Sequence, residues 1–189
     1  NAQNVELCLN ATSIYVVMNE SNGSNDDIGI HMLDITTGDE TFHRRFGSTL
    51  AHDHIARVAW KGTELVIMTN IGSPATSTGL IHVNSANLNV SQSRVFDGGQ
   101  ALVGAQLLTS TDGYSYIGGS ITQAGISYSI VWQVWADGSV GWRRKLNTGY
   151  SSVADMVFEG SNIVVPTGID YGIMMNFVTT STGFVSAGS

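Results

Sequence analysis

Apolar residues alternate with polar ones along short segments of this chain, and the segments recur about every fifty residues. Alternation with a period of two places successive side chains on opposite faces of a β-strand. The clearest repeated segments are Val16-Val17-Met18, Val66-Ile67-Met68, Tyr116-Ile117-Gly118 and Val164-Val165, together with Gly38–Phe46 and Gly138–Leu146. A fixed period of this length indicates one supersecondary unit copied along the chain.

Each unit is predicted to contain four short strands joined by turns. In the third unit we expect strands over 103–108, 114–118, 129–135 and 140–146, with a Gly/Ser-rich loop over 119–127. Asp137-Gly138 lies between the last two strands, and glycine accepts the positive φ that a tight hairpin turn requires. Because the apolar period is two residues throughout, we expect no helix longer than a turn or two.

Four antiparallel strands recurring every 40 to 50 residues predict an all-β fold, a β-propeller of four four-stranded blades. The blades are expected at about 5–46, 55–96, 103–146 and 152–188 of a single domain spanning 1–189. One sheet cannot bury both of its faces alone, whereas radially arranged blades cover one another. Half of an eight-bladed ring, or part of a longer propeller, is the alternative that the same pattern allows.

Two segments of the third unit carry a family resemblance. Leu108–Gly119 and Val131–Trp142 contain an Asp-Gly-Tyr turn, a following glycine, an apolar strand, an Asp-Gly turn and a Trp. This order resembles the repeats of secreted bacterial-type β-propeller proteins over residues 103–146. The aromatic position of Trp142 is kept as Phe42 in the first unit and lost in the other two. The resemblance implies an extracellular location and no catalysis.

The charge balance narrows the possible partners. Charged residues make up 12 % of the 189 residues, the formal net charge is −7, and Lys and Arg together number 8. A nucleic-acid surface needs a basic patch that displaces counterions, so we expect no nucleic-acid partner. No apolar run approaches the roughly 18 residues that a membrane-spanning helix needs, so we expect no membrane span.

Several features favour a secreted or cell-surface protein. The chain begins at Asn1 without an initiator Met or an apolar leader, which we interpret as a removed signal segment or an excised fragment. Asn-x-Ser/Thr patterns make four asparagines glycosylation candidates: Asn10, Asn19, Asn22 and Asn89. Cys8 is the only cysteine, so no internal disulfide is expected, and its apolar strand predicts a buried, unreactive thiol.

The connections between second and third strands, and those between blades, emerge on one face of an up-and-down propeller. In this sequence they are long and polar, whereas the opposite face has only tight turns. Variable loops on a rigid scaffold commonly carry binding function, so we predict a binding site on this long-loop face. Its candidate residues are Asn25, Asp26, Asp27, His52, Asp53, His54, Asp170 and Tyr171.

Two segments carry metal-ligand residue types. His52 and His54 on extended backbone point the same way and could hold zinc or copper, with Asp53 or a loop carboxylate as third ligand. No other unit supplies a matching His, so we expect exposed linker histidines, with no bound metal and no other cofactor. Asn22–Asp27 is rich in oxygen ligands but lacks the spacing of a calcium-binding loop, so a flexible loop is expected there.

Catalysis is not expected. The sequence has no Gly-x-Ser-x-Gly elbow, and no Ser/His/Asp set that the repeats bring together. The remaining histidines are expected on blade surfaces, in packing or in solvent: His31, His43 and His82.

We therefore predict a non-enzymatic extracellular module for protein–protein interaction or structural assembly, with itself or a companion protein as partner. The outermost strand of the last blade is expected to be short, which leaves an edge open to association. The alternative is a lectin that binds glycans on the long-loop face.

Overall fold

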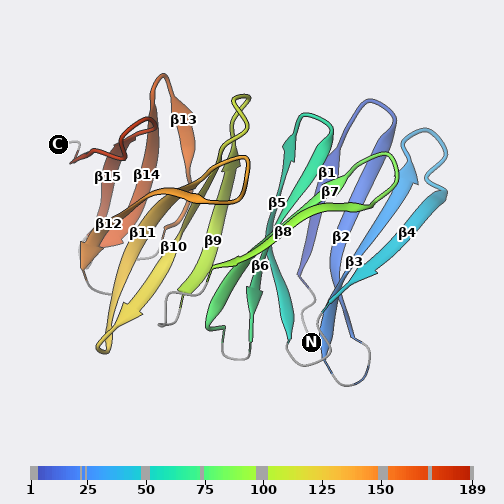
Figure 1. The fold of residues 1–189 in the computed structure, drawn as a ribbon, viewed down its shortest axis with the longest axis horizontal. Coiled ribbons are helices and arrows are strands. Elements are labelled where there is room, and N and C mark those ends of the chain that lie inside the picture. The colour runs from blue at the N-terminus through green and yellow to red at the C-terminus, as the bar shows by residue number, and fades with distance from the viewer. Residues whose placement is uncertain are drawn as a thin grey trace. The chain divides into compact units, whose positions relative to one another are not determined.

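The computed structural model describes residues 4–21, 23, 25–47, 52–72, 75–96, 102–148, 153–169 and 172–187. Over these residues the structure consists of sixteen β-strands and contains no α-helix. The strands form four antiparallel four-stranded sheets, each with its strands in chain order (Figure 1). This confirms the predicted all-β fold, and we refer to the four sheets as blades 1 to 4. None of the described segments is a helix that could cross a membrane.

The chain divides into two compact units, and unit 1 (Asn1–Val95) contains blades 1 and 2. Blade 1 consists of β1 (Val5–Leu9), β2 (Ser13–Ser21), β3 (Asp26–Asp34) and β4 (Glu40–Phe46). Blade 2 consists of β5 (Asp53–Lys61), β6 (Glu64–Ile71), β7 (Ser77–Asn84) and β8 (Val90–Phe96).

Unit 2 (Phe96–Ser189) contains blades 3 and 4. Blade 3 consists of β9 (Leu102–Thr109), β10 (Ser115–Gln123), β11 (Ile126–Val134) and β12 (Val140–Thr148). Blade 4 consists of β13 (Val157–Glu159), β14 (Asn162–Ile169), β15 (Gly172–Thr179) and β16 (Val185–Ala187). The three-residue β16 agrees with the short outermost strand expected there.

Each unit has a hydrophobic core between its two blades. In unit 1 the core contains Tyr15 and Val17 of β2, Ile28 and Ile30 of β3, and buried residues of blade 2 such as Ile67. These side chains are at most 1 % exposed. The blade faces therefore pack on one another as the alternating pattern predicts, because every second residue of a strand points to the same face.

The core of unit 2 is built in the same way. Tyr116 of β10 packs with Trp142 of β12 and, edge to face, with Phe158 of β13 at a ring-centroid distance of 5.6 Å. Ile163 and Val165 of β14 complete the contact from blade 4. Trp142, part of the resemblance seen in the sequence, is thus a packing residue.

The prediction of a long loop between the second and third strands of blade 3 is wrong. In blade 3, β10 and β11 are separated only by Ala124 and Gly125, whose φ angles of 49° and 78° form a tight two-residue turn. The hydroxyls of Thr122 and Ser127 pair across this hairpin at 3.1 Å. The segment 119–127 was predicted as a loop because its residues are small and polar. Polar cross-strand pairs extend a hairpin as apolar pairs do.

The predicted alignment of the repeats is one residue off in blade 1. In blade 1 the turn of the first hairpin is closed by Asn10 and Ser13, directly after Leu9. In blade 2 the equivalent turn is closed by Lys61 and Glu64, directly after Trp60. Leu9 therefore matches Trp60. Tyr15, rather than Val16, is therefore the equivalent of Val66. A one-residue slip moves every side chain to the opposite face of its sheet. Tyr15 faces the core of unit 1, and Val16 lies on the opposite face of blade 1.

Cys8 is half-buried rather than fully buried, and it packs against the core of unit 1. Burial raises the pKa of its thiol, against the smaller opposing effect of the Leu9 backbone. A raised pKa keeps the thiol protonated at neutral pH, which disfavours reaction because the thiolate is the nucleophile.

Candidate functional site

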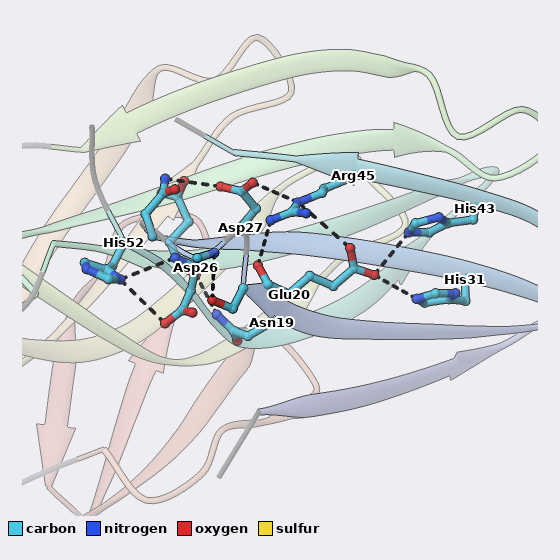
Figure 2. Close-up of polar contacts among 12 residues, drawn as sticks. Asn19, Glu20, Asp26, Asp27, His31, His43, Arg45 and His52 are labelled. Carbon is cyan, nitrogen blue, oxygen red and sulfur yellow. Dashed lines mark hydrogen bonds and ion pairs between the residues drawn. The ribbon is translucent and has the colours of Figure 1, made fainter. Parts of the chain in front are cut away.

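Polar side chains gather on blade 1 and at the start of blade 2, all within unit 1 (Figure 2). Glu20 comes from the end of β2, His31 from β3, His43 from β4, and His52 directly precedes β5. They form two groups: the Glu20 cluster (Glu20, His31, His43) and the His52 cluster (Asp26, His52, His54). In each group the candidate ligand atoms lie within 4.8 Å of one another.

The Glu20 cluster is built by strand pairing. His31 and His43 are direct cross-strand partners in the β3–β4 ladder. Their rings stack with centroids 4.3 Å apart and planes inclined by 9°. The Glu20 carboxylate reaches both of them: Oε1 lies 2.9 Å from His31 Nε2 and 3.1 Å from His43 Nε2. Both imidazoles therefore present the same ring nitrogen to one carboxylate oxygen.

A second carboxylate orients His31 from its other side. His31 Nδ1 lies 2.6 Å from Glu40 Oε2. This hydrogen bond raises the pKa of His31; burial lowers it, and the contact with Glu20 adds to the increase. The imidazole is therefore held at both nitrogens, and its ring orientation is fixed by the protein.

Gly29 allows Glu20 to lie across the sheet. Gly29 sits between Glu20 and the histidines on the same face of blade 1, and a Cβ placed at Gly29 would collide with the Glu20 carboxylate. Any other residue at this position would displace the Glu20 side chain from the two histidines. The sequence therefore specifies the cluster through a glycine as well as through its polar residues.

Asp27 and Arg45 form an ion pair next to the Glu20 cluster. Arg45 Nε lies 2.8 Å from Asp27 Oδ2, and its Nη2 donates to the Glu20 carbonyl oxygen at 3.1 Å. Asp27 is only 9 % exposed. A buried carboxylate requires a partner of this kind, because an unpaired charge is costly to remove from water.

The His52 cluster is arranged differently. The rings of His52 and His54 are parallel within 4°, with centroids 6.0 Å apart, as the His-x-His spacing predicts. His52 Nδ1 faces Asp26, lying 3.5 Å from Oδ2 and 3.3 Å from the backbone nitrogen. The nearby carboxylate is thus Asp26. Asp53 is buried, and its carbonyl oxygen accepts a hydrogen bond from Asn19 Nδ2 at 2.6 Å.

Of the six predicted binding residues that the structure describes, four lie on strands rather than on loops. Asp26 and Asp27 begin β3, and Asp53 begins β5. Asn25 is buried, with its Nδ2 donating to Asp27 Oδ1 at 3.3 Å. Asp170 and Tyr171 lie outside the described residues. The candidates in unit 1 therefore form part of a packed polar network.

The glycosylation candidates differ in their exposure. Asn19 is 5 % exposed and its amide group is hydrogen-bonded to blade 2, so it cannot present a glycan in this fold. Asn10 caps the first hairpin, where its Oδ1 accepts from the Ser13 backbone at 2.8 Å. Asn89 is exposed in the turn before β8. Asn22 lies outside the described residues.

Sequence reasoning missed the Glu20 cluster. His31 and His43 were treated as separate surface or packing residues, and Glu20 and Glu40 were not considered. Folding the sequence about Thr37-Gly38, which the repeat aligns with the predicted turn at Asp137-Gly138, would have placed the two histidines opposite one another. The position of Glu20 could not be found in this way, because its reach depends on the absence of a side chain at Gly29.

A groove of about 490 Å³ lies between blades 1 and 2 within unit 1. Its lining is mostly apolar, and its polar residues are Arg45, Asp53, Thr69, Ser93 and Arg94. In unit 2, two smaller pockets of about 300 and 260 Å³ share Asp112, Tyr116 and Thr180.

No protein-family model and no curated protein sequence matches this chain. Solved structures are similar in fold. An exo-β-1,3-galactanase from Phanerochaete chrysosporium is 12 % identical, with a TM-score of 0.61 over 99 % of this chain and 53 % of its own. The Dos1 propeller is 11 % identical, with a TM-score of 0.65 over 97 % and 46 %. An acylaminoacyl peptidase from Pyrococcus horikoshii is 10 % identical, with a TM-score of 0.63 over 97 % and 32 %.

The chain thus spans about half, or less, of the length of these structures. At such low identity the similarity concerns the fold alone. Together with the four antiparallel sheets, it establishes that this chain consists of four blades of a β-propeller.

Proposed function

We propose that this chain is a non-enzymatic β-propeller module that associates with a second copy of itself through the end faces of blades 1 and 4. The observation that carries the proposal is that these two faces expose apolar side chains whose equivalents in unit 1 are buried or partly buried between blades 1 and 2. We also propose, from the resemblance of the third repeat, that the module acts outside the cell.

The outer face of blade 1 is the face bearing Leu7 and Leu9, opposite the core of unit 1. Leu7 is 63 % exposed and Leu9 is 58 % exposed. Their equivalents in blade 2 are Val58 and Trp60, which are partly buried and pack against the core that blade 1 contributes to. The same positions that join blade 2 to blade 1 are thus uncovered on blade 1 itself.

The outer face of blade 4 is the face bearing Ile173 and Met175. Ile173 is 73 % exposed and Met175 is 40 % exposed. The turns after β3 and β15 are equivalent, since each ends in a glycine whose amide donates four residues back, at Gly38 and Gly183. Counting back from these turns, Ile173 and Met175 match Ile28 and Ile30. This is the pair that blade 1 buries against blade 2.

These two faces are the two halves of the blade-to-blade contact already present inside unit 1. Blade 4 presents, at Ile173 and Met175, the half that blade 1 uses. Blade 1 presents, at Leu7 and Leu9, the half that blade 2 uses at Val58 and Trp60. Full burial of a Leu or Ile side chain contributes about 1.5–3 kcal/mol. Association costs roughly 4–15 kcal/mol in lost freedom. Several such side chains must therefore be buried together, and we expect an association that depends on protein concentration.

Sedimentation velocity over a wide range of protein concentrations tests this function. We expect the wild type to form a species larger than the 20.1 kDa chain. Leu7→Asp should remain a monomer, because the new charge would be buried without a partner. The control is Ile126→Asp, at the start of β11 in blade 3, where Ile126 is 49 % exposed and belongs to neither of the two proposed docking faces. A wild type that sediments only as a monomer, or equal association of both variants, would refute the proposal.

The extracellular location is tested separately by fractionating cells of the source organism. We expect the protein in the medium or at the cell surface. Recovery in the cytosolic fraction alone would refute the location and leave the association proposal standing.

A further inference from the structure

We propose that the Glu20 cluster is a binding site for one zinc ion, with Glu20 Oε1, His31 Nε2 and His43 Nε2 as its three protein ligands. Zinc in proteins is bound tetrahedrally by His nitrogen and carboxylate oxygen at about 2.0–2.2 Å, which separates the ligand atoms by about 3.3 Å. In this structure the carboxylate oxygen lies 2.9 and 3.1 Å from the two ring nitrogens. All three atoms lie within 4.8 Å of one another, with the carboxylate oxygen facing both nitrogens (Figure 2).

The Glu20 cluster lies on the same outer face of blade 1 as Leu7 and Leu9, because Leu7 pairs with Val16 and Val16 pairs with His31. The zinc titration described below is therefore carried out at a protein concentration at which the chain sediments as a monomer.

The contact between His31 and Glu40 is an independent observation that supports a metal site. A histidine that binds zinc commonly donates its other ring N–H to a carboxylate, which fixes the tautomer and the ring orientation. Glu40 Oε2 lies 2.6 Å from His31 Nδ1. With the proton on Nδ1, the lone pair of Nε2 points toward Glu20 and is available to a metal.

The ligands are held in place by the sheet before any metal binds. His31 and His43 are cross-strand partners with stacked rings, and Gly29 leaves the room in which the Glu20 side chain crosses the sheet. The side chains of Glu20, His31 and His43 are 19, 24 and 39 % exposed. Three protein ligands with one side open to solvent leave a fourth position for water, which is the arrangement of an open zinc site.

The charges around the cluster are compatible with a cation. Arg45 is an adverse neighbour, with its Nε 3.9 Å from Glu20 Oε2. Its charge is offset by Asp27, which lies closer, at 2.8 Å. Glu40 adds a further negative charge next to His31. Three carboxylates thus surround one guanidinium and the two imidazoles.

The other blade of unit 1 does not carry this set of residues. Counting from the equivalent hairpins, the positions of Glu20, His31 and His43 are occupied in blade 2 by Ile71, Ile81 and Ser93. All three line the apolar groove between the blades. The polar set is therefore a feature of blade 1 and not part of the repeated core.

The His52 cluster provides a matched control within the same unit. It offers the same residue types, but its ring centroids are 6.0 Å apart and its nearest nitrogen–carboxylate distance is 3.5 Å. A double substitution there removes as many imidazoles as a double substitution at His31 and His43. It therefore corrects for non-specific binding of zinc to surface histidines.

The test is calorimetric titration of zinc sulfate into the metal-free protein, prepared without a polyhistidine tag. We expect one zinc per chain for the wild type and for His52→Ala with His54→Ala. For His31→Ala with His43→Ala we expect at least a 100-fold loss of affinity, and for Glu40→Gln a loss of about 10- to 100-fold. Circular dichroism and thermal melting of each variant check that it is folded.

If the double variant does not fold, Glu20→Gln replaces it, because this change keeps the size of the side chain and removes only a ligand charge. Absorption of the cobalt-loaded protein is the second readout, since a tetrahedral site gives strong visible bands. Absence of zinc binding to the wild type would overturn the proposal. So would loss of zinc only in the His52 and His54 variant.

Discussion

At the scale of single residues, Leu88 shows a buried side chain overriding a backbone preference. It occupies the turn position filled by Gly38, Gly138 and Gly183 in the other blades, and like them it has a positive φ, 53°. A left-handed conformation costs a residue with a Cβ about 1–2 kcal/mol. Leu88 is fully buried in the core of unit 1. Burial of its side chain, worth about 1.5–3 kcal/mol, outweighs that cost.

The positive φ of Leu88 predicts that replacement by Gly is less destabilising than replacement by Ala, the reverse of the usual order. Leu88→Ala removes the buried side chain and keeps the backbone strain, so we expect it to lose about 2–5 kcal/mol of unfolding free energy. Leu88→Gly removes the side chain and relieves the strain, so it should be about 1 kcal/mol more stable than the Ala variant. Urea unfolding measures both. A Gly variant less stable than the Ala variant would show that Leu88 is not strained.

His82 makes stability depend on pH. It is 4 % exposed, and burial lowers the pKa of its imidazole below the usual value of about 6.5, although the contact with Glu64 at 3.2 Å opposes this. The folded protein therefore binds this proton less tightly than the unfolded chain does. Stability from this group is present above pH 6.5, and it falls as the pH drops from there toward the folded pKa.

The measurement is the unfolding free energy of wild type and His82→Gln at pH 7.5, 6.5 and 5.5. We expect the wild type to lose more stability than the variant as the pH falls. A difference between the two proteins that stays constant, or that changes in the opposite direction, would contradict a buried neutral His82.

At the scale of elements, the turns before the fourth strands differ in what surrounds them. Gly38 and Gly183 are equivalent, with φ angles of 78° and 65°. A Cβ at Gly38 would meet open space, whereas a Cβ at Gly183 would come within 2.6 Å of the Trp142 ring. Trp142 is held in place by a hydrogen bond from its Nε1 to the Thr180 carbonyl oxygen at 3.0 Å.

We therefore expect Gly183→Ala to destabilise the protein more than Gly38→Ala. Both changes introduce similar strain of about 1–2 kcal/mol, and only the first also displaces a buried ring. Thermal melting of the two variants, with Trp fluorescence as a local probe of Trp142, compares them directly. Equal losses of stability would mean that the Trp142 ring adjusts without cost.

Strand periodicity was enough to predict the elements of this chain, but not their ends. Period-two alternation and the Asp-Gly and Thr-Gly turns located the four sheets. The small polar residues near Thr122 and Ser127 were predicted as a loop, because a strand whose exposed pairs are hydroxyls has no apolar alternation. Half of the candidate site could be predicted, namely the parallel orientation of His52 and His54. The Glu20 cluster could not, because it depends on the β3–β4 register and on the space at Gly29.

At the scale of the whole molecule, the outer faces of blades 1 and 4 carry the exposed apolar side chains on which the proposed association rests. The equivalents of these side chains in unit 1 are buried or partly buried in the contact between blades 1 and 2. If the account is right, the two faces recognise one another and not themselves. A chain with one disabled face should then still associate with a partner chain that supplies an intact copy of that face.

Mixing two complementary variants tests this central claim most directly. Leu7→Asp disables the face of blade 1, and Ile173→Asp disables the face of blade 4. Each variant alone should sediment as a monomer, since every contact needs both faces. An equimolar mixture should form a heterodimer, which retains one intact pair of faces. A mixture that remains monomeric under conditions in which the wild type associates would contradict the account.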